Sequence, residues 1–303
     1  MKSKYAKLTV SILLMLINSE VASRGAEVFV DSFDYGNGPL VGALNSLWES
    51  HSQAGNGPVL VTSGRMELRS DQLEDINAPL DGGPYTAEGE VQVLFGQFML
   101  EVAELPTSAG TYIAHFRSGN AHRARVWIST ADAAEGHYRI GIGNSSGADA
   151  DSGQVSVDLQ TNVNYRVVFR YHLSSGVSSI GIDPAKESDL MTTAADPVGL
   201  SSVNSIAFRQ SREIGSLWID DVLVTDEFPN SSAPGVRLEI FMQDGSLVVR
   251  WPSHVADYSL ESATSVDSAN WVSDELPIQT DEQWNAYRIS DNAGSQFFRL
   301  RQR

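Results

Sequence analysis

The side chains best suited to recognising a ligand fall on alternate positions of consecutive strand-like segments. They are Arg125, Trp127, Arg139, Arg170 and His172. Successive side chains of a strand face opposite sides of a sheet, so we expect all five to point away from the apolar residues between them, on one sheet face. Guanidinium groups bind carboxylate or sulfate through paired hydrogen bonds, and tryptophan stacks on sugar rings. The spacing predicts a face that binds an anionic glycan. The alternative is a solvated face whose arginines pair with nearby acids.

Patterns typical of enzymes are missing from the sequence. A retaining glycosidase needs two carboxylates about 5 Å apart, but the acids cluster in polar loops, and the adjacent Asp220 and Asp221 should face opposite ways. The six histidines show no metal-ligand spacing, although His115 and His122 flank a turn and could approach each other. No nucleophile elbow or phosphate-binding glycine loop occurs. We therefore expect no enzyme. A divergent jelly-roll glycoside hydrolase or lyase is the alternative.

Calcium is the one metal for which the sequence offers candidate ligands. Asp149 and Asp151 lie in a glycine-bounded acidic segment, residues 147–153. Calcium takes six to eight oxygen ligands, and this segment lacks the EF-hand spacing and its closing glutamate. An ordinary acidic turn is the alternative, and no other cofactor is expected.

The elements that would position these side chains are short antiparallel strands. The clearest stretch is 164–228, where Tyr165, Val167, Phe169 and Tyr171 alternate with polar residues before turns rich in Gly, Ser and Pro. Period-two alternation bounded by such turns indicates strands with one buried face. Similar segments recur at fairly even intervals from residue 27 onward, which favours an all-β sandwich.

The N-terminus reads as a secretory signal peptide. Three lysines precede an apolar run over 8–17, and Val21, Ala22 and Ser23 offer small residues for cleavage. Residues 1–23 carry three Lys and one Glu, so a net charge of −17 becomes −17 − 3 + 1 = −19 after cleavage. Such acidity disfavours nucleic acid and anionic membranes as partners. The chain has no cysteine, which excludes disulfides and thiolate chemistry.

Composition divides the remaining chain into two modules. Residues 24–228 form the large β-domain, and residues 229–235 have the Pro, Ser and Gly content of a linker. Residues 236–303 form a small β-module, for which Trp251, Trp271 and Leu260 could supply an apolar centre.

The large domain resembles the concanavalin-A-like (laminin-G-like) jelly rolls of secreted bacterial proteins. The resemblance covers residues 27–228, and its main motifs are Asp31–Tyr35, Thr111–Phe116, Asn164–Tyr171, Ile206–Ser211 and Ile219–Val222. An aromatic residue of the family pattern is missing at Ile180–Pro184. Residues 236–303 resemble the small immunoglobulin- or fibronectin-like modules that end many such proteins. The resemblance implies an antiparallel jelly-roll sandwich followed by a small β-sandwich.

These observations predict an exported, non-catalytic protein that binds a polysaccharide or a cell-surface glycan and could serve in adhesion. We expect it in the extracellular space, at the cell surface or in the periplasm, with no membrane insertion after cleavage. A structural component of the envelope or matrix is a further alternative. The oligomeric state has no signature in the sequence.

Overall fold

A computed structural model describes residues 26–144, 153–192, 202–229, 238–243, 246–252, 258–264, 271–272, 277–280, 284–289 and 296–302. The chain divides into two compact units, and the larger one is Ser23–Gly235. In this part of the chain no helix is long and apolar enough to span a membrane. The predicted signal peptide lies outside the described residues.

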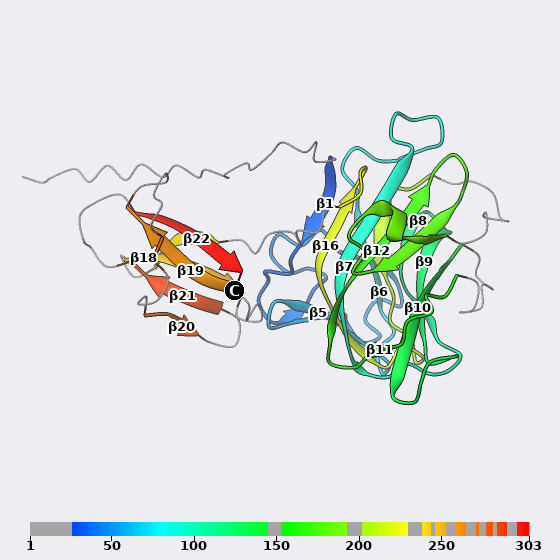
Figure 1. Cartoon of the computed structure of the whole chain (residues 1–303), viewed down its shortest axis with the longest axis horizontal. Coiled ribbons are helices and arrows are strands. Elements are labelled where there is room, and N and C mark those ends of the chain that lie inside the picture. The colour runs from blue at the N-terminus through cyan, green and yellow to red at the C-terminus, as the bar shows by residue number, and fades with distance from the viewer. Residues whose placement is uncertain are drawn as a thin grey trace, which may run out of the picture. The chain divides into compact units, whose positions relative to one another are not determined.

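Two antiparallel sheets form the larger unit (Figure 1). Sheet A has nine strands in the order β14-β13-β12-β7-β16-β5-β4-β2, with β1 also paired to β16. Its strands are β1 (Glu27–Asp31), β2 (Gly38–Pro39), β4 (Leu60–Thr62), β5 (Arg65–Arg69), β7 (Val93–Glu104), β12 (Asn164–His172), β13 (Ser178–Ile182), β14 (Met191–Thr192) and β16 (Ser216–Thr225).

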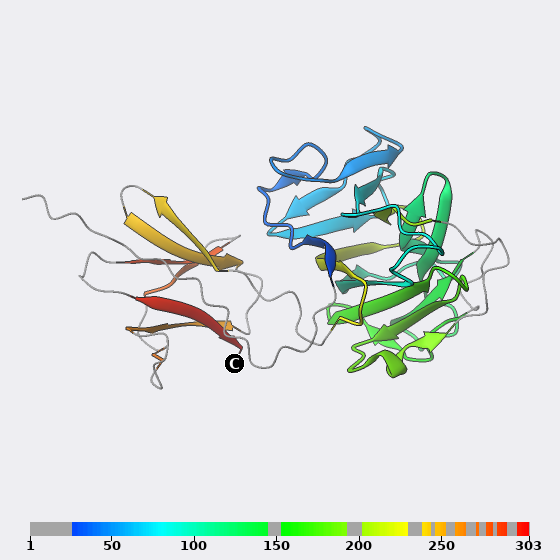
Figure 2. The same ribbon diagram turned by 90° about the horizontal axis from the view of Figure 1, so that it is seen from above.

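Sheet B has seven strands in the order β11-β10-β9-β8-β15-β6-β3. Its strands are β3 (Glu49–Ser52), β6 (Asp75–Pro79), β8 (Thr111–Ser118), β9 (Ala121–Ser129), β10 (His137–Gly143), β11 (Leu159–Gln160) and β15 (Ser205–Phe208). Most of the blue strands of the unit lie on one side of it, the dark blue first strand lies in the middle, and the green strands lie on the other side (Figure 2).

The core lies between the sheets and is built by alternation. Val126, Ile128, Ile140, Val167 and Phe169 are all at most 1% exposed and belong to one apolar cluster. The prediction of an all-β antiparallel sandwich of jelly-roll type is confirmed, because each sheet buries one face and every strand pair in the unit is antiparallel.

One glycine shows how tightly the core is packed. Gly96 on β7 stands opposite Phe169 on β12. A Cβ atom at Gly96 would lie 2.2 Å from the Phe169 ring. The position therefore needs glycine, since the aromatic ring fills the space where any other side chain would begin.

A buried amide ties the two sheets together at one end. Asn144, which follows β10, accepts a hydrogen bond from the Ala124 amide of β9 at 2.8 Å and from the Ser178 hydroxyl of β13. Its own side-chain nitrogen donates to the Gly176 carbonyl at 2.9 Å. Buried polar groups of this kind stabilise a fold only when they are paired, as Asn144 is.

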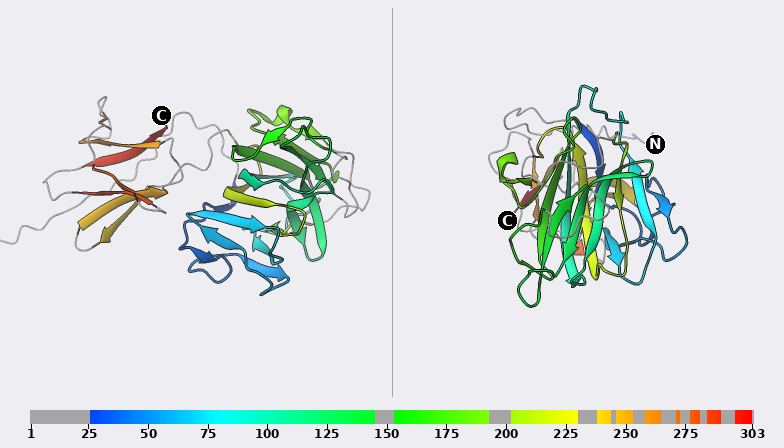
Figure 3. Two further views of the ribbon diagram at one scale, coloured as in Figure 1. Left: turned by 90° about the horizontal axis from the view of Figure 1, so that it is seen from below. Right: turned by 90° about the vertical axis from the view of Figure 1, so that its right-hand side faces the viewer.

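The C-terminal unit, Val236–Arg303, is a small all-β body (Figure 3, orange and red strands). One sheet runs β17-β18-β21-β20 and the other pairs β19 with β22. The strands are β17 (Glu239–Gln243), β18 (Ser246–Pro252), β19 (Tyr258–Ala263), β20 (Gln279–Thr280), β21 (Trp284–Arg288) and β22 (Phe297–Gln302). Val249, Trp251, Leu260 and Tyr287 form its buried core. The immunoglobulin- or fibronectin-like assignment stays a prediction.

Candidate functional site

The predicted binding face is divided between the two sheets. Arg125 and Trp127 lie on β9 and Arg139 lies on β10, both in sheet B, whereas Arg170 and His172 lie on β12 in sheet A. Residues on the outer faces of the two sheets point in opposite directions. The prediction that one face carries all five is therefore wrong. Alternation within each strand was read correctly, but β10 and β12 are not neighbours in a sheet.

Two of the predicted arginines are already paired with acids. Arg139 Nε lies 2.6 Å from Asp158 Oδ1, and Arg170 Nη1 lies 2.5 Å from Glu187 Oε1. His172 Nδ1 lies 3.1 Å from the Ser174 hydroxyl. For Arg139 and Arg170 the structure matches the alternative of a solvated face with ion pairs. The calcium candidates Asp149 and Asp151 lie outside the described residues.

A different group of side chains gathers on the outer face of sheet B, which we call the histidine face. Its members come from strands far apart in the sequence. They are His51, Asn77, Tyr112, His115, Arg117, His122, Arg125, Trp127, Ala207 and Arg209. Two members, Arg125 and Trp127, belong to the predicted set.

Strand register explains how these side chains come to share a face. Ala207 on β15 stands opposite His115 on β8 and Asn77 on β6. In the next row Arg117 on β8 stands opposite His122 on β9. Directly opposed residues of antiparallel strands project to the same side. Ala207 is fully buried although its neighbours Ile206 and Phe208 belong to the core, so the histidine face covers it from outside.

Two irregularities in the β8–β9 pairing bring the key residues to this face. The register shifts once between Tyr112 and Ala114 and again between Ala114 and Phe116. A bulge inserts one residue, so side chains three apart instead of two share a side. Tyr112 with His115, and His122 with Arg125, therefore both point outward. Ala124, between the last two, has a positive φ of 47°, and its amide is the one held by Asn144.

The rings on the face are in mutual contact. The His115 and His122 centroids lie 4.2 Å apart with planes tilted by 36°. His51 lies 6.1 Å from His115 and 6.3 Å from His122. Strands β3 and β8 are separated by two others, so a flat sheet would hold their backbones about 14 Å apart. The side chains of His51 and His115 therefore lean toward each other across β6 and β15.

An aromatic pair with guanidinium groups extends the face beyond the histidines. The Tyr112 ring lies 5.3 Å from His115 and 5.7 Å from Trp127. Arg125 and Arg209 place their guanidinium carbons 5.1 Å and 4.6 Å from the centre of the Tyr112 ring. These cation–π contacts hold positive charge against an aromatic surface.

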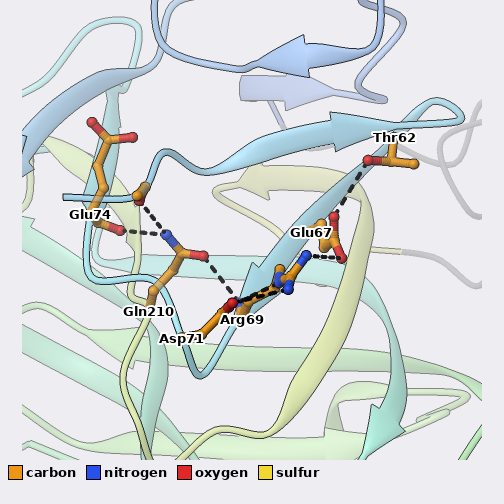
Figure 4. Close-up of polar contacts among 7 residues, drawn as sticks. Thr62, Glu67, Arg69, Asp71, Glu74 and Gln210 are labelled. Carbon is orange, nitrogen blue, oxygen red and sulfur yellow. Dashed lines mark hydrogen bonds and ion pairs between the residues drawn. The ribbon is translucent and has the colours of Figure 1, made fainter. Parts of the chain in front are cut away.

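Arg209 is positioned by its neighbour in the chain, Gln210. The Gln210 side chain accepts a hydrogen bond from the Arg69 amide at 3.0 Å and donates to the carbonyls of Gly57 and Glu74 at 3.3 and 3.2 Å (Figure 4). The backbone amide of Gln210 donates to Asp75 Oδ1 at 3.2 Å. With only 2% of its surface exposed, Gln210 fixes the chain at the end of β15.

Burial and nearby cations keep the histidines uncharged. Burial, followed by the charge of Arg117, lowers the pKa of His51 to about 4. Burial and the charge of Arg125 lower the pKa of His122 to about 4 as well. Full burial lowers the pKa of His115 well below its ordinary value. At neutral pH the face therefore presents neutral imidazoles beside guanidinium cations.

A carboxyl lies beside Arg209 at the edge of the face. Burial raises the pKa of Asp75 to about 6, and the opposing charge of Arg209 limits the rise. Asp75 and Asn77 are two residues apart on β6, so they point to the same side.

Several buried ring nitrogens on this face have no hydrogen-bond partner among the described residues. They are both nitrogens of His115, Nε2 of His51 and Nε1 of Trp127. His115 is completely buried. Buried polar atoms are nearly always paired, and an unpaired one in a native structure calls for an explanation such as a ligand or a catalytic role.

The histidines do not form a metal site. Within the described ranges, no group of three or more His, Cys, Asp or Glu side chains is arranged to hold a metal ion. Zinc needs nitrogens that converge on one point about 2 Å away. The rings of His115 and His122 pack against each other instead, 4.2 Å apart and tilted by 36°.

Sequence reasoning missed most of this face for identifiable reasons. The sequence left open that His115 and His122 could approach each other, and their ring centroids lie 4.2 Å apart. His51 lies too far away in the sequence for its pairing to be foreseen. Strict alternation puts His122 and Arg125 on opposite faces, and no glycine marks the bulge at Ala124. The adjacent apolar residues Ile113 and Ala114, both buried, are the one local sign of a bulge.

No known family model matches the chain, and no characterised protein matches it in sequence. Among solved structures, a sialidase superposes with a TM-score of 0.41 at 11% identity, over 64% of this chain and 19% of the sialidase. A botulinum neurotoxin serotype C1 binding domain gives a TM-score of 0.37 at 10% identity, over 78% of each chain. An alginate lyase from Pseudomonas aeruginosa gives 0.34 at 12% identity, over 51% of this chain and 74% of the lyase.

These similarities are distant, and the chain spans only about a fifth of the sialidase. They carry no argument about activity. The proposals that follow rest on the side chains of the histidine face.

Proposed function

We propose that this protein binds carboxylated polysaccharides through the histidine face. The observation that carries the proposal is the cluster around Tyr112, whose ring lies beside Trp127 and His115 and under the guanidinium groups of Arg125 and Arg209. Such a surface supplies both hydrogen-bonding groups and rings on which sugars stack.

Charge indicates the class of glycan. The chain as a whole carries −17, yet Arg117, Arg125 and Arg209 gather on this face together with neutral histidines. Guanidinium groups bind carboxylates through paired, charge-assisted hydrogen bonds. A local positive surface on an acidic protein favours an anionic ligand there and disfavours one elsewhere.

Affinity electrophoresis tests the proposal. The full chain is run in gels containing a polyuronate or a neutral glucan, and we expect retardation by the polyuronate alone. Trp127→Ala removes a stacking surface, and Arg209→Gln removes a cation from the Tyr112 ring. We expect each change to weaken binding about 10-fold, which corresponds to ~1.4 kcal/mol.

Arg170→Ala is the matched control, because Arg170 lies on sheet A and is paired with Glu187. It should leave retardation unchanged. Equal retardation of wild type and both face variants would refute the proposal, as would no retardation of the wild type.

The place of action follows as part of the same proposal. A signal peptide over residues 1–23 would export the chain to where polysaccharides occur, and binding there would serve adhesion to a matrix or a cell surface. Size comparison of the exported chain with the full-length translation product tests the cleavage.

A further inference from the structure

We infer that the histidine face also cleaves the polyuronate it binds, by β-elimination, with His122 as the base and Tyr112 as the acid. The inference rests on the proposed function, because it requires the polyuronate to lie on this face. The observation that carries it is that an imidazole, a phenol and a guanidinium–amide pair lie close together on one sheet face. They belong to His122, Tyr112 and the pair of Arg117 and Asn77.

The reaction breaks the C5–H and C4–O bonds, forms a C4=C5 double bond and protonates the leaving oxygen. In a 4-linked uronate, the base takes the hydrogen on C5, which is next to the carboxylate. The electrons of the C5–H bond form a C4=C5 double bond, and the C4–O bond breaks. The leaving oxygen takes a proton from the acid, and solvent returns the base and the acid to their starting forms. No oxidant, reductant or water addition is needed.

The first requirement is a group that holds the carboxylate and stabilises the charge that develops on it. Arg117 Nη1 donates to Asn77 Oδ1 at 3.1 Å, which sets a guanidinium group and a side-chain amide nitrogen side by side as donors. Both residues lie on the outer face of sheet B. Preorganised donors at the point where charge develops are the largest single contribution in many enzymes.

The second requirement is a neutral base next to that carboxylate. His122 stands directly opposite Arg117 in the register of β8 and β9, and it is half-buried. Burial and Arg125 lower its pKa to about 4, so the imidazole is free to accept a proton at neutral pH. A bound carboxylate offsets the guanidinium charges, which makes His122 a stronger base when substrate is present.

The third requirement is an acid within reach of the leaving oxygen. The centroid of the Tyr112 ring lies 6.3 Å from that of His122, so the phenol and the imidazole belong to one group of side chains on this face. His115 lies beside both rings, with its centroid 5.3 Å from Tyr112 and 4.2 Å from His122, and supports them. His115 is fully buried, so we assign it a positioning role.

The placement of base and acid on one face predicts which uronates react. Both groups approach the sugar from the same side, so the C5 hydrogen and the 4-oxygen must leave from one side of the ring. They lie on the same side in D-mannuronate and D-glucuronate, and on opposite sides in L-guluronate and D-galacturonate. We expect polymannuronate to be cleaved and polyguluronate and polygalacturonate to resist.

The experiment uses the purified full chain with each of the three polymers. Elimination is followed by the ultraviolet absorbance of the conjugated C4=C5 product, and binding is measured separately by affinity electrophoresis. Wild type should generate the absorbance with polymannuronate. Tyr112→Phe and His122→Gln should lower the rate about 100-fold or more while retaining most of the binding, because proton transfer contributes on that order.

His172→Gln is the matched control, since His172 is a half-buried histidine on sheet A, away from this face. It should cleave like wild type. Tyr112→Phe keeps the aromatic ring, so a rate loss with an unchanged thermal melt separates chemistry from folding. Binding without absorbance would overturn this inference alone, whereas absence of binding would overturn the proposed function. Preferential cleavage of polyguluronate would overturn the assignment of base and acid.

Discussion

The outer faces of the two sheets both carry arginine and histidine, but these side chains make different contacts on each face. On sheet A, Arg166 donates to Gln97 and to the carbonyls of Pro184 and Pro229, and Arg170 pairs with Glu187. On sheet B, guanidinium groups stack on Tyr112, and the histidines beside it have unpaired ring nitrogens. Composition alone does not distinguish arginines that pair with groups of the chain from arginines that lie against an aromatic ring.

Taken with the proposed function, the difference predicts that stability depends more on the outer face of sheet A and glycan binding on the outer face of sheet B. Removing a buried polar group whose partners lie within the chain leaves those partners unpaired, which destabilises the fold. Each prediction below changes one face and asks whether the other is affected.

The largest effect should come from Arg166→Met on sheet A. Arg166 is 7% exposed, and its loss leaves the buried Gln97 side chain and two carbonyls without a donor. We expect the free energy of unfolding to fall by about 2–3 kcal/mol in urea denaturation, with polyuronate binding by the folded protein unchanged. Arg65→Met, at a half-buried ion pair with Glu101 on the same sheet, should cost less. Equal losses would show that Arg166 has no special structural role.

The second largest effect should be a loss of folding stability on acidification, which comes from the histidine face. His51 and His122 have pKa values of about 4 when folded and 6.5 when unfolded, so below pH 6.5 the unfolded chain binds more protons. Their stabilising contribution is complete above pH 6.5 and is lost as the pH falls toward 4. Both side chains are partly exposed, so solvent screening reduces the expected loss to about 1 kcal/mol for each.

The acid effect is measured as a difference, because Asp75, whose pKa is raised to about 6, opposes it over the same range. Thermal melts of wild type and His122→Gln at pH 7 and pH 5 should show a smaller drop for the variant. His172→Gln should match wild type at both pH values. If the melting temperature fell equally in all three proteins between pH 7 and pH 5, His122 would not be the cause of the acid effect.

The smallest effect should come from Arg170→Ala. Arg170 and Glu187 form a partly exposed ion pair at 2.5 Å, with 21% and 47% of their side chains exposed. Such pairs are worth less than about 1 kcal/mol, and 0.5 M salt should reduce the difference further. A loss as large as that of Arg166→Met in urea denaturation would contradict the division of roles within sheet A.

Alternation of apolar and polar residues predicted the individual strands well, but it did not predict which strands share a sheet. Alternation identified Val126, Ile140 and Phe169 as core residues, and all three are buried. The error was to treat segments that follow each other in sequence as neighbours in one sheet. The chain continues from β10 to β11 within sheet B and then crosses to β12 in sheet A. No local property of the segment between them signals that crossing.

The histidine face depends on long-range pairing, which explains why it escaped prediction. His51 comes from an edge strand, and Arg209 follows a strand that enters sheet B between β6 and β8. Register, and not spacing along the chain, brings them together. Arg125 and Trp127 could be predicted because they share one strand and lie on the same side of its bulge.

Ala124 has one further consequence. Its left-handed backbone accommodates the extra residue that turns both His122 and Arg125 outward. Without this backbone conformation, regular alternation over the same residues would direct the imidazole toward the hydrophobic interior, with no change in any side chain. The identity of this surface thus depends on the backbone conformation at one alanine as much as on which side chains the strand carries.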